Sequence, residues 1–389
     1  MEQNKETIET LAMGTTIEEM KAQYFDSQAL HEPNYRLYQL NSRGKRYYYM
    51  FDENGNPIFY PSVTTILKNV MPENVQLTEW KLSLGKEQSL AYSLERASYG
   101  TFIHGQLAEL MISRTYPLDE IHERLSKYAE RENLPIAFVE DHEEEAKADI
   151  VAFAKWMRDY DVRPYAVEVS IYSPTLKIAG MIDLVCNMRE KPISEEQKAL
   201  EKLQEKLDKA EGDEKKVKVI MEAIDAVKGD FSKRIDAICD FKSGKKGFYD
   251  EYAIQLELYR QMWNENYLEH PIYHIFNIAP KEWTKTVKKV PSYSFEEQTE
   301  NKVLLRVPYL LELYKLMDAE TRNITVISGN LTLDNEDDMA NVRIYSLEEL
   351  VKTRSNSEGE PKPITKEEGE KTLNTLLNKE GDMGDLFSK

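Results

Sequence analysis

The sequence predicts an α/β fold in which a mixed central sheet is flanked by helices. Short apolar runs of strand length recur through the middle of the chain, at residues 166–172, 178–188, 237–241 and 272–278. Longer segments whose apolar residues repeat at helical spacing alternate with these runs, and the clearest cover residues 141–160 and 251–264. The chain of 389 residues is long enough to bury a substantial core around such a sheet.

We expect residues 1–34 to form an N-terminal helical segment, with the helix itself between about residues 5 and 30. Residues 35–60 are rich in Tyr and Phe and are interrupted twice by turn-forming residues, which predicts a β-hairpin or meander. Ser62 is suited to cap a short helix, because its hydroxyl can accept a hydrogen bond from a backbone N–H of the first turn.

A helical pattern also covers residues 74–113, with an interruption expected near Tyr99 and Gly100. Further along the chain, residues 284–290 predict a strand and residues 295–317 predict a long helix.

Residues 194–230 predict an antiparallel helical hairpin inserted between two strands. Each half carries apolar residues three or four apart, namely Leu200, Leu203 and Leu207 in the first half and Val217, Ile220, Ile224 and Val227 in the second. Such a hairpin is either a solvent-exposed insertion whose two helices pack on each other along a narrow apolar stripe, or an arm that guides a partner or DNA.

The net charge of −18 counts against a protein that binds nucleic acid. The charge is unevenly distributed, however. Residues 331–389 hold 14 acidic against 8 basic residues, and we expect this tail to be acidic and flexible. Basic residues gather elsewhere, at Arg43, Lys45 and Arg46, at Lys242, Lys245 and Lys246, and at Lys281, Lys285, Lys288 and Lys289. Local potential in a groove, rather than the global sum, decides whether DNA binds.

Neither a membrane span nor a signal peptide is predicted, because apolar runs are too short and the N-terminus lacks the basic and apolar regions of a leader. We therefore expect a cytoplasmic protein. Cys186 and Cys239 cannot supply the four thiolates of an iron–sulfur cluster or of an all-cysteine zinc site. A buried, reduced pair is expected.

Two of the apolar strand runs are interrupted by a carboxylate. Asp183 lies within residues 180–185, and Asp240 begins the tripeptide Asp240-Phe241-Lys242. Because a buried charge is costly unless it is paired or bound to a metal, two such interruptions on neighbouring strands indicate a shared cation. Lys242 lies two residues beyond Asp240, so strand alternation puts both on one face.

Hydrolysis of a phosphodiester needs these groups. Hard carboxylate oxygens hold Mg²⁺ or Mn²⁺, which activates a bound water. Asp183 and Asp240 would be ligands with the Phe241 carbonyl as a further candidate, and Lys242 would orient the water or neutralise developing charge. Asp-x-Lys alone is a weak signal, and taken by itself an ordinary edge-strand pair is the better explanation of it.

Two helical features strengthen the pattern. Gln255 and Tyr259 lie four residues apart on one helix face, which either presents an amide and a phenol to the site or is a polar face with a half-buried Tyr. His104 follows Gly100 on a helix and is a candidate metal ligand, although a packing histidine is the simpler interpretation of that residue alone.

Four short motifs now stand in order along the chain: Gly100 and His104, Gly180 and Asp183, Asp240 and Lys242, and Gln255 and Tyr259. That series resembles the PD-(D/E)XK nucleases of the RecB type. Residues 61–67, followed by Trp80 and Lys81, are further similar to exonucleases of the mitochondrial genome maintenance type and to related phage exonucleases. The resemblance covers residues 35–282 without the hairpin, and implies a nuclease domain over residues 35–330.

The resemblance implies a DNA exonuclease that acts on single-stranded or flapped ends in phage or mobile-element recombination or replication, in a bacterial or phage-infected cell. It makes His104 a metal ligand beside Asp183 and Asp240, with Lys242, Gln255 and Tyr259 completing the catalytic set. Mg²⁺ or Mn²⁺ is the implied cofactor, and the cluster-free branch is favoured because the chain lacks the four cysteines of the iron–sulfur members. A restriction-like or structure-specific endonuclease and a non-catalytic DNA-binding recombination accessory remain alternatives.

Several residues stand beside this set. Glu168 lies on the preceding strand, where we expect it to act through the ligands, and Glu109 is a weaker candidate on the helix of His104. Residues 385–387 (Asp-Leu-Phe) loosely resemble a sliding-clamp-binding peptide without its usual Gln, or are a frayed end. The aromatic residues at 47–49 and 59–60 either stack on unpaired bases or pack in the core.

Overall fold

The computed structural model describes residues 17–27, 30, 32–33, 35–42, 45–52, 57–73, 75–210, 212–244, 247–283, 290–318, 325–328 and 343–346. The chain divides into two compact units. Unit 1 comprises Met1–Pro33, Pro72–Ile171 and Met181–Val307, and unit 2 comprises Asn34–Met71, Tyr172–Gly180 and Pro308–Lys389. The expected domain over residues 35–330 is therefore shared between two units, and each is described separately below.

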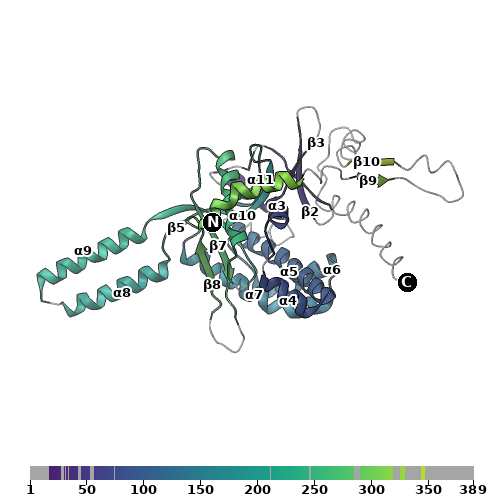
Figure 1. Ribbon diagram of the computed structural model, residues 1–389. Coiled ribbons are helices and arrows are strands. Elements are labelled where there is room, and N and C mark those ends of the chain that lie inside the picture. The colour runs from purple at the N-terminus through teal and green to yellow at the C-terminus, as the bar shows by residue number, and fades with distance from the viewer. Residues whose placement is uncertain are drawn as a thin grey trace, which may run out of the picture. The chain divides into compact units, whose positions relative to one another are not determined.

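Most of a five-stranded sheet belongs to unit 1 (Figure 1). Its order is β4-β5-β6-β7-β8, with bounds Arg163–Ser173, Ile178–Arg189, Arg234–Phe241, His274–Pro280 and Tyr293–Glu297. β5 pairs antiparallel with β6, β6 pairs parallel with β7, and β7 pairs antiparallel with β8. The sheet is thus mixed, which confirms the α/β fold class predicted from the alternating apolar runs.

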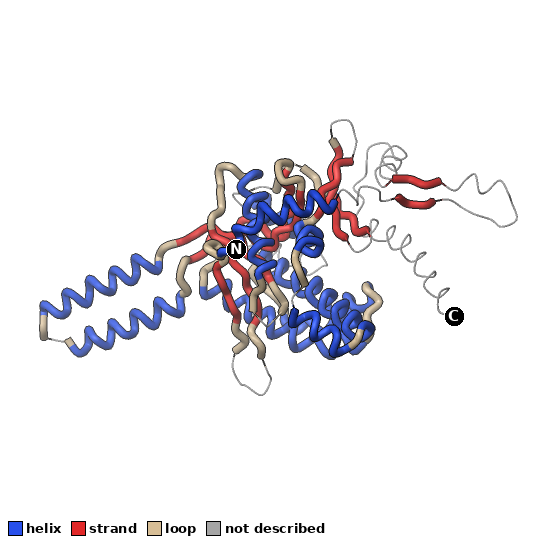
Figure 2. Tube along the Cα trace, in the orientation of Figure 1, coloured by secondary structure: helices blue, strands red, loops and turns tan. Residues whose placement is uncertain are grey.

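Helices cover both faces of this sheet. Those of unit 1 outside the hairpin are α2 (Ile17–Ser27), α4 (Val75–Leu84), α5 (Lys86–Ser113), α6 (Ile121–Arg131), α7 (Ile136–Asp159) and α10 (Asp250–Asn266), with short 3₁₀ turns η1 (Leu118–Glu120) and η2 (Lys302–Arg306). Phe241 packs on Phe153 of α7, and the next residue, Lys242, meets α10. Neighbouring residues of an extended chain point to opposite faces, so α7 and α10 cover opposite sides. Figures 1 and 2 show α4 to α7 as one group of helices.

Aromatic side chains form the core between α7 and the sheet. Trp156 is fully buried and its ring contacts those of Phe153, Phe241 and Phe295 at centroid distances between 5.1 and 6.5 Å. Cys186 and Cys239 are free and buried. None of the helices in the described ranges combines the length and the apolar character that a membrane span requires.

The helical pattern of residues 74–113 breaks at a different glycine from the one expected. Gly85 adopts a positive φ of +81°, which separates α4 from α5, whereas α5 runs without interruption through Tyr99 and Gly100. A left-handed backbone is favourable only for glycine, and it ends a helix, whereas a glycine with helical angles does not. Helix α6 was not predicted, although its buried residues Ile121, Leu125 and Ala129 repeat every four positions.

The expected long helix over residues 295–317 was wrong at its start. Phe295 lies in strand β8, where its ring stacks on Phe276 of β7, and the chain then passes through η2 before α11 (Val307–Asp318). Pairing with β7 outweighs the local helical pattern there. The strand expected over residues 284–290 falls almost wholly outside the described residues, as does the N-terminal part of the helix expected from residue 5.

Two helices join β5 to β6 and lie side by side (Figure 1). They are α8 (Ile193–Lys209) and α9 (Glu214–Phe231), close to the bounds expected for the hairpin. At its base the two strands stay paired, because Arg189 lies opposite Arg234 and the Glu190 N–H donates to the Lys233 carbonyl at 3.0 Å. The insertion therefore leaves the sheet register intact.

Unit 2 contains a three-stranded antiparallel sheet of β1 (Tyr38–Ser42), β2 (Lys45–Phe51) and β3 (Pro57–Pro61), followed by α3 (Val63–Val70), and a strand pair of β9 (Thr325–Ser328) and β10 (Arg343–Ser346). Ser62 caps α3 as expected, since its Oγ accepts from the Thr65 N–H at 3.0 Å. Tyr48 and Tyr60 are buried against Ala179.

Removing the hairpin should leave a folded protein. We predict that replacing residues 191–232 by Asn-Gly, a pair that forms tight two-residue turns, changes the free energy of unfolding by less than about 2 kcal/mol. The Glu190–Lys233 contact would then close the turn directly. Urea denaturation followed by circular dichroism measures this, and loss of the cooperative transition would show that the hairpin is needed for the sheet.

Candidate functional site

The pairing of β5 with β6 brings the two carboxylates of the sequence motifs onto neighbouring strands. Leu184 lies opposite Cys239, and continuation of this register sets Asp183 beside Asp240. The backbone N–H of Phe241 donates to Asp183 Oδ2 at 2.8 Å. Asp183 is 7% exposed and Asp240 is 2% exposed, so neither charge has more than slight access to water.

Asp183 belongs to a cluster of three possible metal ligands. The nearest ligand atoms of His104, Glu168 and Asp183 all lie within 4.8 Å of one another. Nδ1 of His104 is 3.5 Å from Asp183 Oδ1 and 3.8 Å from Glu168 Oε1. These residues come from α5, β4 and β5, so the cluster joins one helix to two strands.

The inner face of α5 positions His104. Arg96, Gly100 and His104 are four residues apart and share that face. An Arg96 N–H donates to the Ser243 carbonyl at 3.4 Å, and a Cβ on Gly100 would lie 3.6 Å from Ser243 Oγ. The helix therefore runs close along the segment that follows Asp240-Phe241-Lys242.

Glu168 has an unusual backbone for a residue within a strand. Its φ is +50°, in the left-handed region, which costs a non-glycine residue about 1–3 kcal/mol and clusters at functional sites. Lys21 of α2 donates to its backbone carbonyl at 2.8 Å. The buried Glu168 Oε1 has no hydrogen-bond partner among the described residues. A strained backbone thus directs an unsatisfied acceptor toward His104 and Asp183.

Asp240 is held by other neighbours. Its Oδ2 lies 2.7 Å from the Lys242 ammonium and accepts a hydrogen bond from the Asn277 amide at 3.1 Å. Asn277 is completely buried on β7, directly opposite Asp240 in the parallel register. Asp240 is not one of the three clustered ligands, and its fixed partner is the lysine of its own motif.

The two expected helical residues also reach this group. Gln255 Oε1 accepts from the Lys242 ammonium at 3.1 Å, and Gln255 Nε2 donates to the Tyr259 hydroxyl at 2.9 Å. Both side chains are at least nine-tenths buried on α10. A chain of hydrogen bonds therefore runs from Asp240 through Lys242 and Gln255 to Tyr259.

Burial and mutual charge shift the pKa values of the cluster. Burial alone would lower the pKa of His104, but the carboxylates of Asp183 and Glu168 outweigh it and raise that pKa well above its ordinary value. Burial raises the pKa of Glu168, and the charge of Asp183 adds to the rise. Burial also raises the pKa of Asp240 to about 6, although Lys242 opposes it. Burial would also raise the pKa of Asp183, but the charge and hydrogen bond of His104 outweigh burial and lower that pKa.

These residues suit a hard divalent cation. Three carboxylates crowd into one poorly hydrated region, and a bound cation would relieve their repulsion. Glu168 Oε1, which accepts no hydrogen bond from the described residues, is a suitable ligand atom for it. Carboxylate oxygens with one imidazole match the preferences of Mg²⁺ and, because of the nitrogen ligand, of Mn²⁺.

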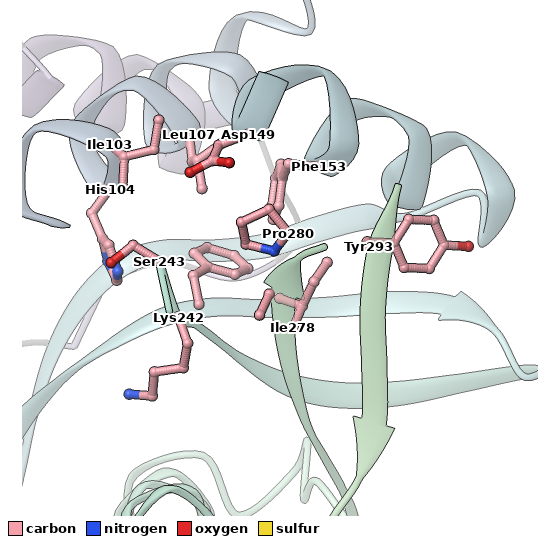
Figure 3. A pocket seen from close by; sticks show the side chains of 12 residues that line it. Ile103, His104, Leu107, Asp149, Phe153, Lys242, Ser243, Ile278, Pro280 and Tyr293 are labelled. Carbon is pink, nitrogen blue, oxygen red and sulfur yellow. The ribbon is translucent and has the colours of Figure 1, made fainter. Parts of the chain in front are cut away.

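A cavity lies beside the cluster (Figure 3). It is lined by Ile103, His104, Leu107, Asp149, Phe153, Phe241, Lys242, Ser243, Ile278, Ala279, Pro280 and Tyr293. Most of these side chains are apolar, and Figure 3 shows the Lys242 ammonium pointing away from them. This cavity is therefore a mainly apolar space beside the polar groups of the cluster.

Some expected residues lie elsewhere or play a different part. Glu109 is not in the cluster, because it forms an ion pair with Arg124 of α6. Tyr47, Tyr48, Tyr49 and Tyr60 are buried, so most of that aromatic set packs in the core of unit 2, and residues 385–387 lie outside the described ranges. Phe241 contributes its N–H and a buried ring; its carbonyl remains a candidate ligand.

Glu168 plays a larger part in the site than expected, and Asn277 was not among the predicted residues. Glu168 was expected to act only through the ligands, yet its carboxylate lies among them. Asn277 interrupts the apolar run of residues 272–278 as Asp183 and Asp240 interrupt theirs. A polar residue within an apolar strand run is thus the sequence signal that identifies Asn277.

No family model and no curated protein matches the chain. What the site can do chemically follows from its own residues. A histidine and two carboxylates form a place for a cation, and beside it a lysine ammonium is held by a carboxylate and an amide. Such a pairing of a cation site with a fixed positive charge suits reactions at a polyanionic centre.

Removing one clustered carboxylate should weaken metal binding. We predict that Glu168→Gln and Asp183→Asn each reduce the affinity for Mn²⁺ by about 10-fold or more, since each removes a charged ligand atom. Glu109→Gln is the matched control, because that carboxylate pairs with Arg124 outside the cluster. Titration followed by the electron paramagnetic resonance of free Mn²⁺ measures the affinities; equal values for Glu168→Gln and Glu109→Gln would contradict the assignment.

Proposed function

We propose that this protein is a metal-dependent DNA nuclease of the PD-(D/E)XK type that hydrolyses phosphodiester bonds. The observation that carries the proposal is the convergence of the His104–Glu168–Asp183 cluster with the Asp240–Lys242 pair on adjacent strands. The mixed sheet with helices on both faces is compatible with that fold. His104, Glu168 and Asp183 would hold Mg²⁺ or Mn²⁺, with Asp240 and the Phe241 carbonyl completing the set.

A divalent cation in this site would lower the pKa of an attacking water and neutralise charge on a phosphoryl oxygen. The remaining work falls to the protein's own side chains. Lys242 presents an ammonium that stabilises the charge developing on the phosphate, and Asp240 and Gln255 keep it in place. Tyr259 fixes the orientation of the Gln255 amide, so that its oxygen faces Lys242.

The substrate we propose is DNA with single-stranded or flapped ends. The protein would act on it as an exonuclease during phage or mobile-element recombination or replication. This part of the proposal is supported by the order of the four sequence motifs and by their similarity to phage and mitochondrial exonucleases.

Activity should depend on Asp240. We predict that Asp240→Asn lowers the rate of DNA cleavage with Mg²⁺ or Mn²⁺ by about 10²- to 10³-fold, since the charge that holds Lys242 is lost. Asp236→Asn is the control, because Asp236 lies on the same strand but is exposed and contacts Tyr165 and Asn187. Release of labelled nucleotides from linear DNA measures the rates. If the wild-type protein and Asp240→Asn were equally inactive on every DNA, the result would favour a non-catalytic accessory protein instead.

The form of the DNA should decide whether it is cut. We predict that linear single-stranded DNA is degraded and that closed circular DNA, which has no end, is left intact at the same enzyme concentration. Gel electrophoresis of both substrates over a time course gives the answer. Cutting of closed circles would contradict the exonuclease proposal and favour a restriction-like or structure-specific endonuclease.

A further inference from the structure

The Lys242 ammonium has a third neighbour besides Asp240 and Gln255. An ammonium carries three N–H donors, and in the described part of the chain two oxygens contact it, at 2.7 Å from Asp240 and 3.1 Å from Gln255. Its remaining neighbour is the ring of Tyr252, with Nζ 4.5 Å from the ring centroid. That distance is well within the range of a cation–π interaction.

Tyr252 lies on the same face of α10 as Gln255, the other helical partner of Lys242. It lies three residues before Gln255 and seven before Tyr259 on α10, which puts the three side chains on one side of the helix. Burial, reinforced by the charge of Glu251, raises the pKa of Tyr252 above its usual value, so the ring is neutral at physiological pH. A neutral ring face carries the negative side of the aromatic quadrupole.

We propose that Tyr252 is a positioning residue for Lys242, a role that rests on the proposed nuclease function. A third carboxylate or amide oxygen would accept the last N–H and fully saturate the ammonium. The ring attracts the positive charge without accepting a directed hydrogen bond of comparable strength. Tyr252 thereby holds the ammonium in place and leaves one N–H able to turn to a phosphodiester oxygen.

Two substitutions separate the ring from the hydroxyl. Tyr252→Phe keeps the ring face, so kcat should stay within about 2-fold of wild type. Tyr252→Leu removes it, and kcat should fall by about 3- to 30-fold, which corresponds to about 0.7–2 kcal/mol for a partly desolvated cation–π contact. KM for DNA should change by less than about 2-fold in both, because Lys242 acts on the charge that develops during the reaction.

A matched control accounts for general loss of stability. Tyr267 is the C-cap residue of the same helix. Its ring stacks on that of Trp263, with 3.9 Å between the ring centroids. Tyr267→Leu also removes a partly buried tyrosine from α10, and it should leave kcat unchanged. If Tyr267→Leu slowed cleavage as much as Tyr252→Leu, the effect would be structural and the proposal would be overturned.

The contact itself can be measured without activity. The ring current of Tyr252 should shift the ε-methylene proton resonances of Lys242 upfield in lysine-labelled protein, with Lys242→Arg providing the assignment. The shift should persist in Tyr252→Phe and disappear in Tyr252→Leu. An unshifted wild-type signal, or Tyr252→Phe as slow as Tyr252→Leu, would overturn the proposal. If wild type cleaves no DNA, the nuclease function fails, while these resonances still decide whether the ring holds Lys242.

Discussion

The antiparallel pairing of β5 with β6 is the constraint on which the rest of the site depends. It sets Asp183 beside Asp240 and lets the Phe241 N–H bind the Asp183 carboxylate. Because side chains alternate along a strand, a slip of one residue would turn Asp183 to the opposite face and away from His104. The hairpin between the two strands leaves this register undisturbed, since pairing continues to Arg189 and Arg234 at its base.

A buried concentration of negative charge follows from that register. Asp183, Asp240 and Glu168 come together where water has little access, and their pKa values shift in different directions as a result. The protein compensates each carboxylate locally, with His104 beside Asp183 and Lys242 beside Asp240. Among the described residues Glu168 Oε1 has no hydrogen-bond partner, so the incompletely compensated part of the site is also the part best suited to a cation.

Much of the sheet and two elements of the site were predictable because they leave a local trace. Asp183 and Asp240 interrupt apolar runs, and Gln255 and Tyr259 repeat at helical spacing. The role of Glu168 was not predictable, because it depends on a left-handed backbone and on Lys21, which is 147 positions away along the chain. The misplaced helix break at Gly100 has a similar cause, since only the backbone angles distinguish it from Gly85.

We propose that His104, Glu168 and Asp183 bind one divalent cation beside Lys242. The most direct measurement is a crystal structure of the protein soaked with Mn²⁺, with diffraction recorded at a wavelength where manganese scatters anomalously. An anomalous peak at about 2.0–2.3 Å from a nitrogen of His104 and from oxygens of Glu168 and Asp183 is the predicted result. Manganese bound elsewhere, with no peak between these three side chains, would contradict it.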